Sequence, residues 1–274
     1  HYVRSHGQPI QTVLLVLKDI LNRTPLDDIE AAAVTGSGGK LLAQVINISF
    51  INEIVSQSTA TGYFHPDVRT VIEIGGEDSK FMFLELDANT RKTKVVDFSM
   101  NTMCAAGTGS FLDQQANRLG VSIENEFGEM ALKSASPPRI AGRCSVFAKT
   151  DMIHLQQEAT PVHDIVAGLC YALARNFKSN IAKGKEFIKP IAFQGGVAAN
   201  KGIIKAFEDL LGLARGELVI PKYFPVMGAI GAALTLIDKR IYSPLSGTES
   251  LGKYLNERKH RRDLVLKHRE KIAV

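Results

Sequence analysis

Long apolar segments are missing from this sequence of 274 residues. A helix that crosses a bilayer needs roughly 20 consecutive apolar residues, and no run in the chain approaches that length. The N-terminus also lacks the positive charge followed by an apolar stretch that marks a secretory signal. We therefore expect a cytoplasmic protein that has no membrane partner.

Cysteine is scarce as well, with three residues in the chain. Three cysteines cannot form the disulfide framework of a small secreted domain, so metal binding or catalysis is the alternative to burial. Cys170 lies among apolar residues at helical spacing, which predicts that it belongs to the core. Cys104 and Cys144 each precede a predicted helix, whose positive end would stabilise a thiolate. Two unconnected buried cysteines are the alternative interpretation.

An extended basic surface is missing from most of the chain. The net charge is +5, but residues 239–274 hold ten Lys and Arg against four Asp and Glu, a net of +6 that leaves −1 for the rest. A segment of mixed charge is typical of a solvent-exposed helix. We therefore expect a basic helical tail or linker at 239–274 and no nucleic-acid partner.

The first glycine-rich motif lies within residues 71–86, which we interpret as two strands joined by a tight turn. Gly75 and Gly76 would let a phosphate approach the backbone. Asp78 can hold Mg²⁺ directly or through water, and Ser79 or Lys80 can contact phosphate oxygens. A plain hairpin with a polar turn is the alternative. A third antiparallel strand is expected near residues 94–99.

Two further glycine motifs precede predicted helices. Gly107, Thr108 and Gly109 lead into a helix that begins near Ser110, a suitable place for a phosphate. Residues 190–194 form an apolar strand that runs into Gly195 and Gly196, and a ligand is expected at the carboxyl end of such a strand. Near the N-terminus, residues 2–4 resemble the end of a strand, and helical spacing of apolar residues follows from Pro9.

Five motifs in fixed order carry a resemblance to a known family. They are residues 74–80, 101–111, 142–148, 194–200 and 227–229. Together they resemble the ATP-dependent activators of 2-hydroxyacyl-CoA dehydratases and the related ATPase subunits of benzoyl-CoA reductases. The resemblance covers roughly residues 1–238 and implies an α/β fold of the actin-like ATPase superfamily, which includes sugar kinases and heat-shock 70 proteins.

The same resemblance implies a division into two ribonuclease-H-like lobes, in agreement with a length that exceeds a single core. We expect residues 1–69, together with a returning helix at 226–238, to be the remainder of the N-terminal lobe. Residues 70–225 would then be the lobe that binds the cluster and the nucleotide.

The resemblance also implies a function for the motifs. The activators form homodimers in which two cysteines per subunit, here Cys104 and Cys144, hold a bridging [4Fe–4S] cluster. Such a protein takes an electron from ferredoxin or flavodoxin and, with ATP and Mg²⁺, passes it to an iron–sulfur dehydratase or reductase. By the same resemblance Asp78 and Glu77 would be catalytic, and the nucleotide would be bound by Gly75, Gly76, Ser79, Lys80, Gly107, Thr108, Gly109, Gly195, Gly196 and Asn200.

Three departures from the family pattern leave other functions open. The family's first strand, with its Asp-x-Gly-Ser/Thr phosphate loop, has no counterpart before Tyr2, so we expect weak nucleotide binding or hydrolysis by this chain alone. Glu77 stands where many activators have Gln, and residues 239–274 extend past the expected end, as in a fused polypeptide. A sugar-kinase-like phosphotransferase and a degenerate nucleotide-binding scaffold are the two alternatives.

Overall fold

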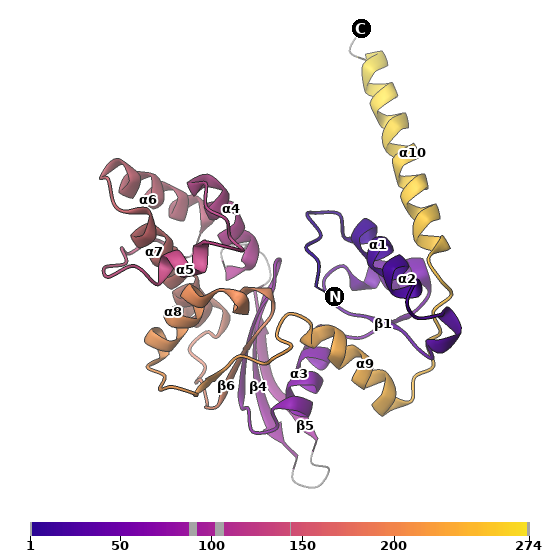
Figure 1. Ribbon diagram of the computed structural model, residues 1–274, viewed down its shortest axis with the longest axis horizontal. Coiled ribbons are helices and arrows are strands. Elements are labelled where there is room, and N and C mark those ends of the chain that lie inside the picture. Colours follow the sequence, from indigo (N-terminus) through magenta and orange to yellow (C-terminus); the bar gives the residue numbers. More distant parts are fainter. Residues whose placement is uncertain (1, 88–91, 102–106, 143, 273–274) are drawn as a thin grey trace. The chain divides into compact units, whose positions relative to one another are not determined.

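The computed structural model describes residues 2–87, 92–101, 107–142 and 144–272, with 261–272 as helix backbone only (Figure 1). The chain divides into two compact units, one of His1–Ser56 with Gly228–Val274 and one of Gln57–Met227. Each unit contains its own clusters of buried apolar side chains. Within the described residues, no helix is both long and apolar enough to cross a membrane.

The unit Gln57–Met227 is built on a five-stranded sheet of order β5-β4-β3-β6-β7. β3 (Thr70–Ile74) pairs antiparallel with β4 (Ser79–Leu86), and β4 pairs antiparallel with β5 (Thr93–Met100). This confirms the predicted hairpin and third strand. β6 (Ile191–Gln194) pairs parallel with β3, and β7 (Leu218–Val219) pairs parallel with β6. Strands far apart in the sequence therefore end at the same edge of the sheet.

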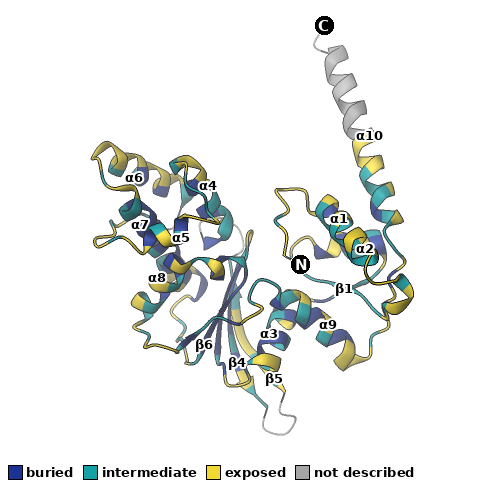
Figure 2. Cartoon of the chain, viewed as in Figure 1, coloured by how far each residue is buried: buried dark blue, intermediate teal, exposed yellow. Residues whose placement is uncertain are grey.

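Helices pack on this sheet and bury its central strands, which are dark blue in Figure 2. One face, with Ile72, Phe81 and Phe193, belongs to the main apolar core of the unit. Cys170 lies in that core and is fully buried, as predicted. The helical elements are α3 (Glu53–Phe64, from residue 57), α4 (Gly109–Leu119), α5 (Phe127–Ala131), α6 (Ser145–Gln157), α7 (Val162–Asn176), the π-helical turn η3 (Phe177–Ile181), the 3₁₀ turn η4 (Gly196–Ala199) and α8 (Lys201–Leu211).

The other unit is mainly helical and has one small parallel sheet, in which Ala33 and Val34 pair with Ser49 and Phe50. The predicted strand at residues 2–4 is wrong: these residues adopt no regular structure and pair with no strand among the described residues. The elements are α1 (Pro9–Leu21), the 3₁₀ turn η1 (Leu26–Asp28), β1 (Ala33–Val34), α2 (Gly39–Ile46), β2 (Ser49–Phe50), α9 (Met227–Lys239) and α10 (Glu249–Ile272).

The beginning of the segment 239–274 contributes to the core of this unit. Leu245 and Leu251 are buried in one cluster with Ile10, Leu42 and Ile46. Full burial of one large apolar side chain stabilises the folded protein by about 1.5–3 kcal/mol. The first turn of α10 is therefore attached to the helices α1 and α2, and the exposed, charged residues follow it.

Close packing within the unit of His1–Ser56 and Gly228–Val274, between α9 and the first residues of α3 that belong to this unit, requires a glycine. A Cβ atom at Gly231 would lie 1.7 Å from the carbonyl oxygen of Ser56 and 2.5 Å from its carbonyl carbon. Both are backbone atoms of a helix, so they cannot move aside as a flexible side chain would. Gly252 in α10 has no atom within 4 Å of such a Cβ position.

We predict opposite effects for alanine at these two helical glycines. Gly231→Ala should lower the free energy of unfolding by about 2 kcal/mol or more, because the new methyl group overlaps the α3 backbone. Gly252→Ala should raise that free energy by up to about 1 kcal/mol, through higher helix propensity alone. Urea unfolding followed by circular dichroism measures both. Equal effects of the two substitutions would contradict the close packing.

Candidate functional site

Two glycine turns meet at the carboxyl edge of the central sheet. Glu73 of β3 and Gln194 of β6 are paired in parallel register, so both strands end together. Gly195 has φ 88° and ψ 168°, a conformation that only glycine adopts readily. A Cβ atom there would lie 2.4 Å from the carbonyl oxygen of Ile74. The turn after β6 is thus packed directly on the end of β3.

The start of α4 docks on the turn after β3. The backbone N–H of Gly109 donates to the carbonyl oxygen of Gly75 at 2.8 Å, and that of Ser110 donates to Gly76 at 2.9 Å. A Cβ atom at Gly109 would lie 3.0 Å from the Gly75 oxygen. The structure therefore brings together three of the predicted glycine motifs, and two of the amides at the helix start are engaged within the protein.

The turn between β3 and β4 has an open side. Gly76 and Glu77 are exposed and Asp78 is partly buried. A Cβ atom at Gly76 would meet no atom within 4 Å. The turn is therefore open at Gly76 and Glu77, at the edge where an open α/β sheet binds its ligands.

Other predicted site residues are buried beneath this turn. The Ser79 hydroxyl donates to the carbonyl oxygen of Gly107 at 2.5 Å, and its backbone N–H donates to Asn101 Oδ1 at 2.7 Å. Lys80 and Thr108 are 1% and 0% exposed. Contact of Ser79, Lys80 or Thr108 with phosphate stays a prediction. The hydrogen bond of Ser79 to Gly107 attaches the second glycine motif to the hairpin.

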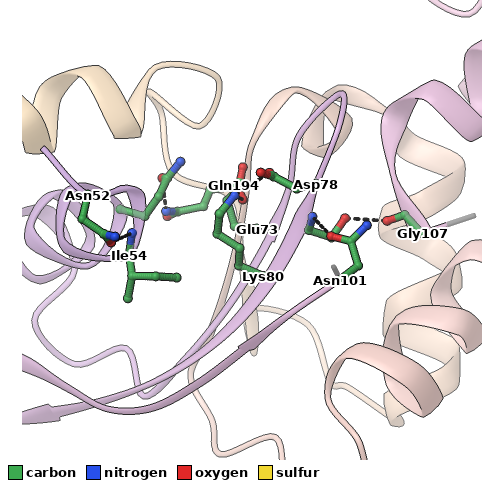
Figure 3. Close-up of polar contacts among 10 residues, drawn as sticks. Asn52, Ile54, Glu73, Asp78, Lys80, Asn101, Gly107 and Gln194 are labelled. Atoms are coloured by element: carbon green, nitrogen blue, oxygen red, sulfur yellow. Dashed lines mark hydrogen bonds and ion pairs between the residues drawn. The ribbon is translucent and has the colours of Figure 1, made fainter. Parts of the chain in front are cut away.

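A buried polar row crosses the sheet under the turns, and sequence reasoning missed most of it. Lys80, Glu73 and Gln194 occupy paired positions on three neighbouring strands (Figure 3). Lys80 Nζ lies 3.0 Å from Glu73 Oε2. Gln194 continues the row by accepting from Thr61 Oγ1 at 2.9 Å and donating to Gln57 Oε1 at 2.6 Å. Ile74 and Ser79 are paired on either side of the turn, and Glu73 and Lys80 each lie one residue farther from it. Counting outward from the predicted turn could therefore have predicted that Glu73 pairs with Lys80.

Asn200, predicted to line the nucleoside side, caps a helix. Its side-chain Oδ1 accepts the backbone N–H of Ile203 at 3.2 Å at the start of α8. Asparagine is among the preferred residues at this position because it satisfies a free amide of the first turn. Gly196 begins the 3₁₀ turn η4 between Gly195 and Asn200. The third motif thus connects β6 to α8 by a short, well-ordered turn.

Cys144 stands at the start of α6, as predicted. It is the N-cap residue, with extended backbone angles, and is a partly exposed free thiol. The preceding loop is held by Asp151 Oδ2, which accepts the N–H of Ala141 at 2.8 Å, and by Arg175, which donates to the Ile140 carbonyl at 3.0 Å. These two bonds attach residues 140 and 141 to α6 and α7.

Of the other two cysteines, Cys170 is buried in the core. Cys104 lies outside the described residues. Burial raises the pKa of the Cys170 thiol far above its usual value, so that side chain stays protonated and is unsuited to bind a metal ion. Among the described residues no group of three or more His, Cys, Asp or Glu side chains could hold a metal ion.

Comparison with known proteins gives a consistent result. Residues 2–235 match the BadF/BadG/BcrA/BcrD ATPase family. The 2-hydroxyisocaproyl-CoA dehydratase activator of Clostridioides difficile is 33% identical over 226 residues, 82% of this chain and 80% of the relative. The (R)-2-hydroxyglutaryl-CoA dehydratase activating ATPase of Acidaminococcus fermentans is 33% identical over 213 residues, 78% of this chain and 77% of the relative.

A solved structure supports the same grouping in three dimensions. The activator of the 2-hydroxyisocaproyl-CoA dehydratase from Clostridium difficile, with bound ADPNP, has a TM-score of 0.70 to this chain. The sequence identity is 33%, and the match covers 82% of this chain and 80% of that one. The predicted α/β fold of the actin-like ATPases is confirmed.

The packing of the turns predicts different responses to alanine at two site glycines. Gly195→Ala should lower the free energy of unfolding by about 3 kcal/mol, because it combines an unfavourable backbone conformation with overlap at Ile74. Gly76→Ala should change it by less than about 1 kcal/mol, since its Cβ meets open space. Thermal and urea unfolding of both variants provide the test, and a stable Gly195→Ala variant would contradict the contact between the turns.

Proposed function

Because the chain belongs to the BadF/BadG/BcrA/BcrD ATPase family, we propose that it is an ATP-dependent activator of a CoA-thioester enzyme. It passes a low-potential electron from a [4Fe–4S] cluster to a 2-hydroxyacyl-CoA dehydratase or a related reductase. Ferredoxin or flavodoxin is the proposed electron donor. A homodimer in the cytoplasm is the proposed assembly.

The observation that carries this proposal is the similarity to two dehydratase activators. The identity is 33% to each, over about four fifths of the chain. The matched region includes the glycine turns and Cys144. A sugar-kinase-like enzyme of the same fold would leave Cys104 and Cys144 without a task.

We assign the nucleotide to the open side of the three turns. Glycine backbone at 75–76 and 107–109 lets phosphates approach closely, and Gly195 and Gly196 lie on the nucleoside side. The partly exposed Asp78 is suited to hold Mg²⁺ directly or through water, with exposed Glu77 next to it. Asn200 and the start of α8 form the nucleoside side. The buried Ser79, Lys80 and Thr108 support the turns from below.

Cys144 is suited to be a ligand of an iron–sulfur cluster. A [4Fe–4S] cluster is held by four cysteine thiolates and supplies one-electron transfer. Cys144 is a free, partly exposed thiol at the N-cap of α6. Cys104 is the proposed second ligand. Two ligands per subunit require a twofold axis to complete the set of four.

The first turn of α6 also offers a surface that is suited to bind a second subunit or a partner protein. Val146 and Phe147, in the first turn of α6, are each 65% exposed. Exposed apolar side chains in neighbouring positions are typical of surfaces that bind proteins. Their place directly after Cys144 supports an interface around the proposed cluster.

The substitution Gly76→Ala should weaken nucleotide binding without lowering the stability of the fold. The added methyl group points into open space and would meet the proposed phosphate. We expect the affinity for Mg²⁺·ATP to fall about tenfold, roughly 1.4 kcal/mol, with an unchanged melting temperature. Isothermal titration calorimetry with the non-hydrolysable analogue ADPNP measures the affinity. Undiminished binding would remove Gly76 from the site.

Iron and acid-labile sulfide analysis of protein purified without oxygen tests the proposed function. Four irons per dimer are expected, with the visible and EPR spectra of a [4Fe–4S] cluster. Cys104→Ser and Cys144→Ser should each lose the cluster, because either substitution removes two of its four ligands in the dimer.

Cys170→Ser is the matched control, because its thiol is fully buried in the core of the same unit. That variant should keep its iron. If the protein is free of iron and cannot be reconstituted, the electron-transfer function is overturned. The chain would then be a member of the ATPase family with another function. Cluster retention in Cys144→Ser would instead contradict the ligand assignment.

A further inference from the structure

Lys80 is a buried ammonium group between two carboxylates at the proposed nucleotide edge. Its Nζ lies 3.0 Å from Glu73 Oε2 and 2.5 Å from Asp78 Oδ1 (Figure 3). The side chains of Lys80 and Glu73 are 2% and 6% exposed, whereas that of Asp78 is 20% exposed. Lys80 thus connects a carboxylate inside the protein to one that reaches the open side of the turn.

The strand register fixes this arrangement. Glu73 and Lys80 are directly paired on β3 and β4, so their side chains share one face of the sheet. Asp78 ends the turn that joins these strands, two residues before Lys80. Both carboxylates are therefore held by one rigid hairpin, with the ammonium group between them.

The charges of these groups matter for a ligand that is itself an anion. Two adjacent carboxylates without Lys80 would repel each other and a nearby phosphate. With Lys80 the three side chains carry one net negative charge, which would suit a magnesium ion bound together with the nucleotide. A direct bond from Lys80 to phosphate does not agree with the geometry, because its ammonium group is buried and directed at Glu73 and Asp78.

We propose that Lys80 is a positioning residue that orients Asp78 toward the magnesium ion of the bound nucleotide. Glu73 anchors the ammonium group from the interior side. This inference rests on the proposed nucleotide site and adds to it the residue that sets the affinity for the metal. Lys80 acts through Asp78 and makes no contact with the nucleotide.

A double-mutant cycle tests the proposal. Lys80→Met keeps an unbranched side chain but removes the charge, and Lys80→Arg keeps the charge. The readout is binding of ADP as a function of Mn²⁺ concentration, with bound Mn²⁺ followed by EPR. We expect Lys80→Met to raise the Mn²⁺ concentration at half-saturation about tenfold or more, and Lys80→Arg to raise it less.

The second arm of the cycle uses Asp78→Asn. If Lys80 acts through Asp78, Lys80→Met should have little further effect on Mn²⁺ dependence in the Asp78→Asn background. Lys189→Met is the control, because Lys189 forms an exposed ion pair with Glu217 at 2.7 Å, at the opposite end of β6. That control should bind Mn²⁺ and ADP as the wild type does.

Different results overturn different conclusions. The positioning role is overturned if Lys80→Met and Lys80→Arg leave the Mn²⁺ dependence unchanged. It is also overturned if Lys80→Met has the same effect in the wild type and in the Asp78→Asn background. A third result would also overturn the positioning role: Lys80→Met binds ADP more weakly at every Mn²⁺ concentration, but the Mn²⁺ concentration at half-saturation stays the same. That result would assign Lys80 to direct contact with phosphate. Absence of nucleotide binding by the wild type would overturn the proposed function and this inference with it. Lys80→Arg keeps the test valid if Lys80→Met does not fold.

Discussion

Parallel pairing of β3 with β6 is the constraint on which the candidate site depends. It aligns Glu73 with Gln194 and so places the two glycine turns that follow in direct contact. The start of α4 then completes the edge, because its first amides bond to the carbonyl groups of Gly75 and Gly76. Glycine is required at Gly195 and Gly109 by these close approaches, before any ligand is considered.

The polar row beneath the turns depends on the same pairing. A buried ion pair adds little to the stability of a fold, because the cost of removing both charges from water offsets most of their attraction. Here the row reaches from Lys80 through Glu73 to Gln194 and on to α3. Its position directly under the open turn would hold carboxylate groups in place for the proposed nucleotide and its metal ion. The fold and the proposed chemistry thus have a common structural origin.

Local sequence signals predicted much of this fold but not its long-range contacts. The hairpin at Gly75 and the helix predicted to follow the Gly195–Gly196 motif come from nearby glycine and apolar spacing, and both are confirmed. The pairing of β3 with β6 joins segments far apart in the sequence, and no local pattern specifies it. Burial of Lys80 was missed for the same reason: a lysine beside a glycine turn looks exposed until its paired strand is known. Cys104 lies outside the described residues, so its predicted role stays a prediction.

Amide hydrogen exchange with and without Mg²⁺·ADPNP tests most directly whether the three turns form the nucleotide site. Binding should slow exchange in residues 75–79, 107–112 and 195–200 together, because a ligand held by all three turns stabilises their shared hydrogen bonds. The surface of α8 away from Asn200 should show no change. Protection confined to other segments, or absent from these three despite saturation with nucleotide, would contradict the account.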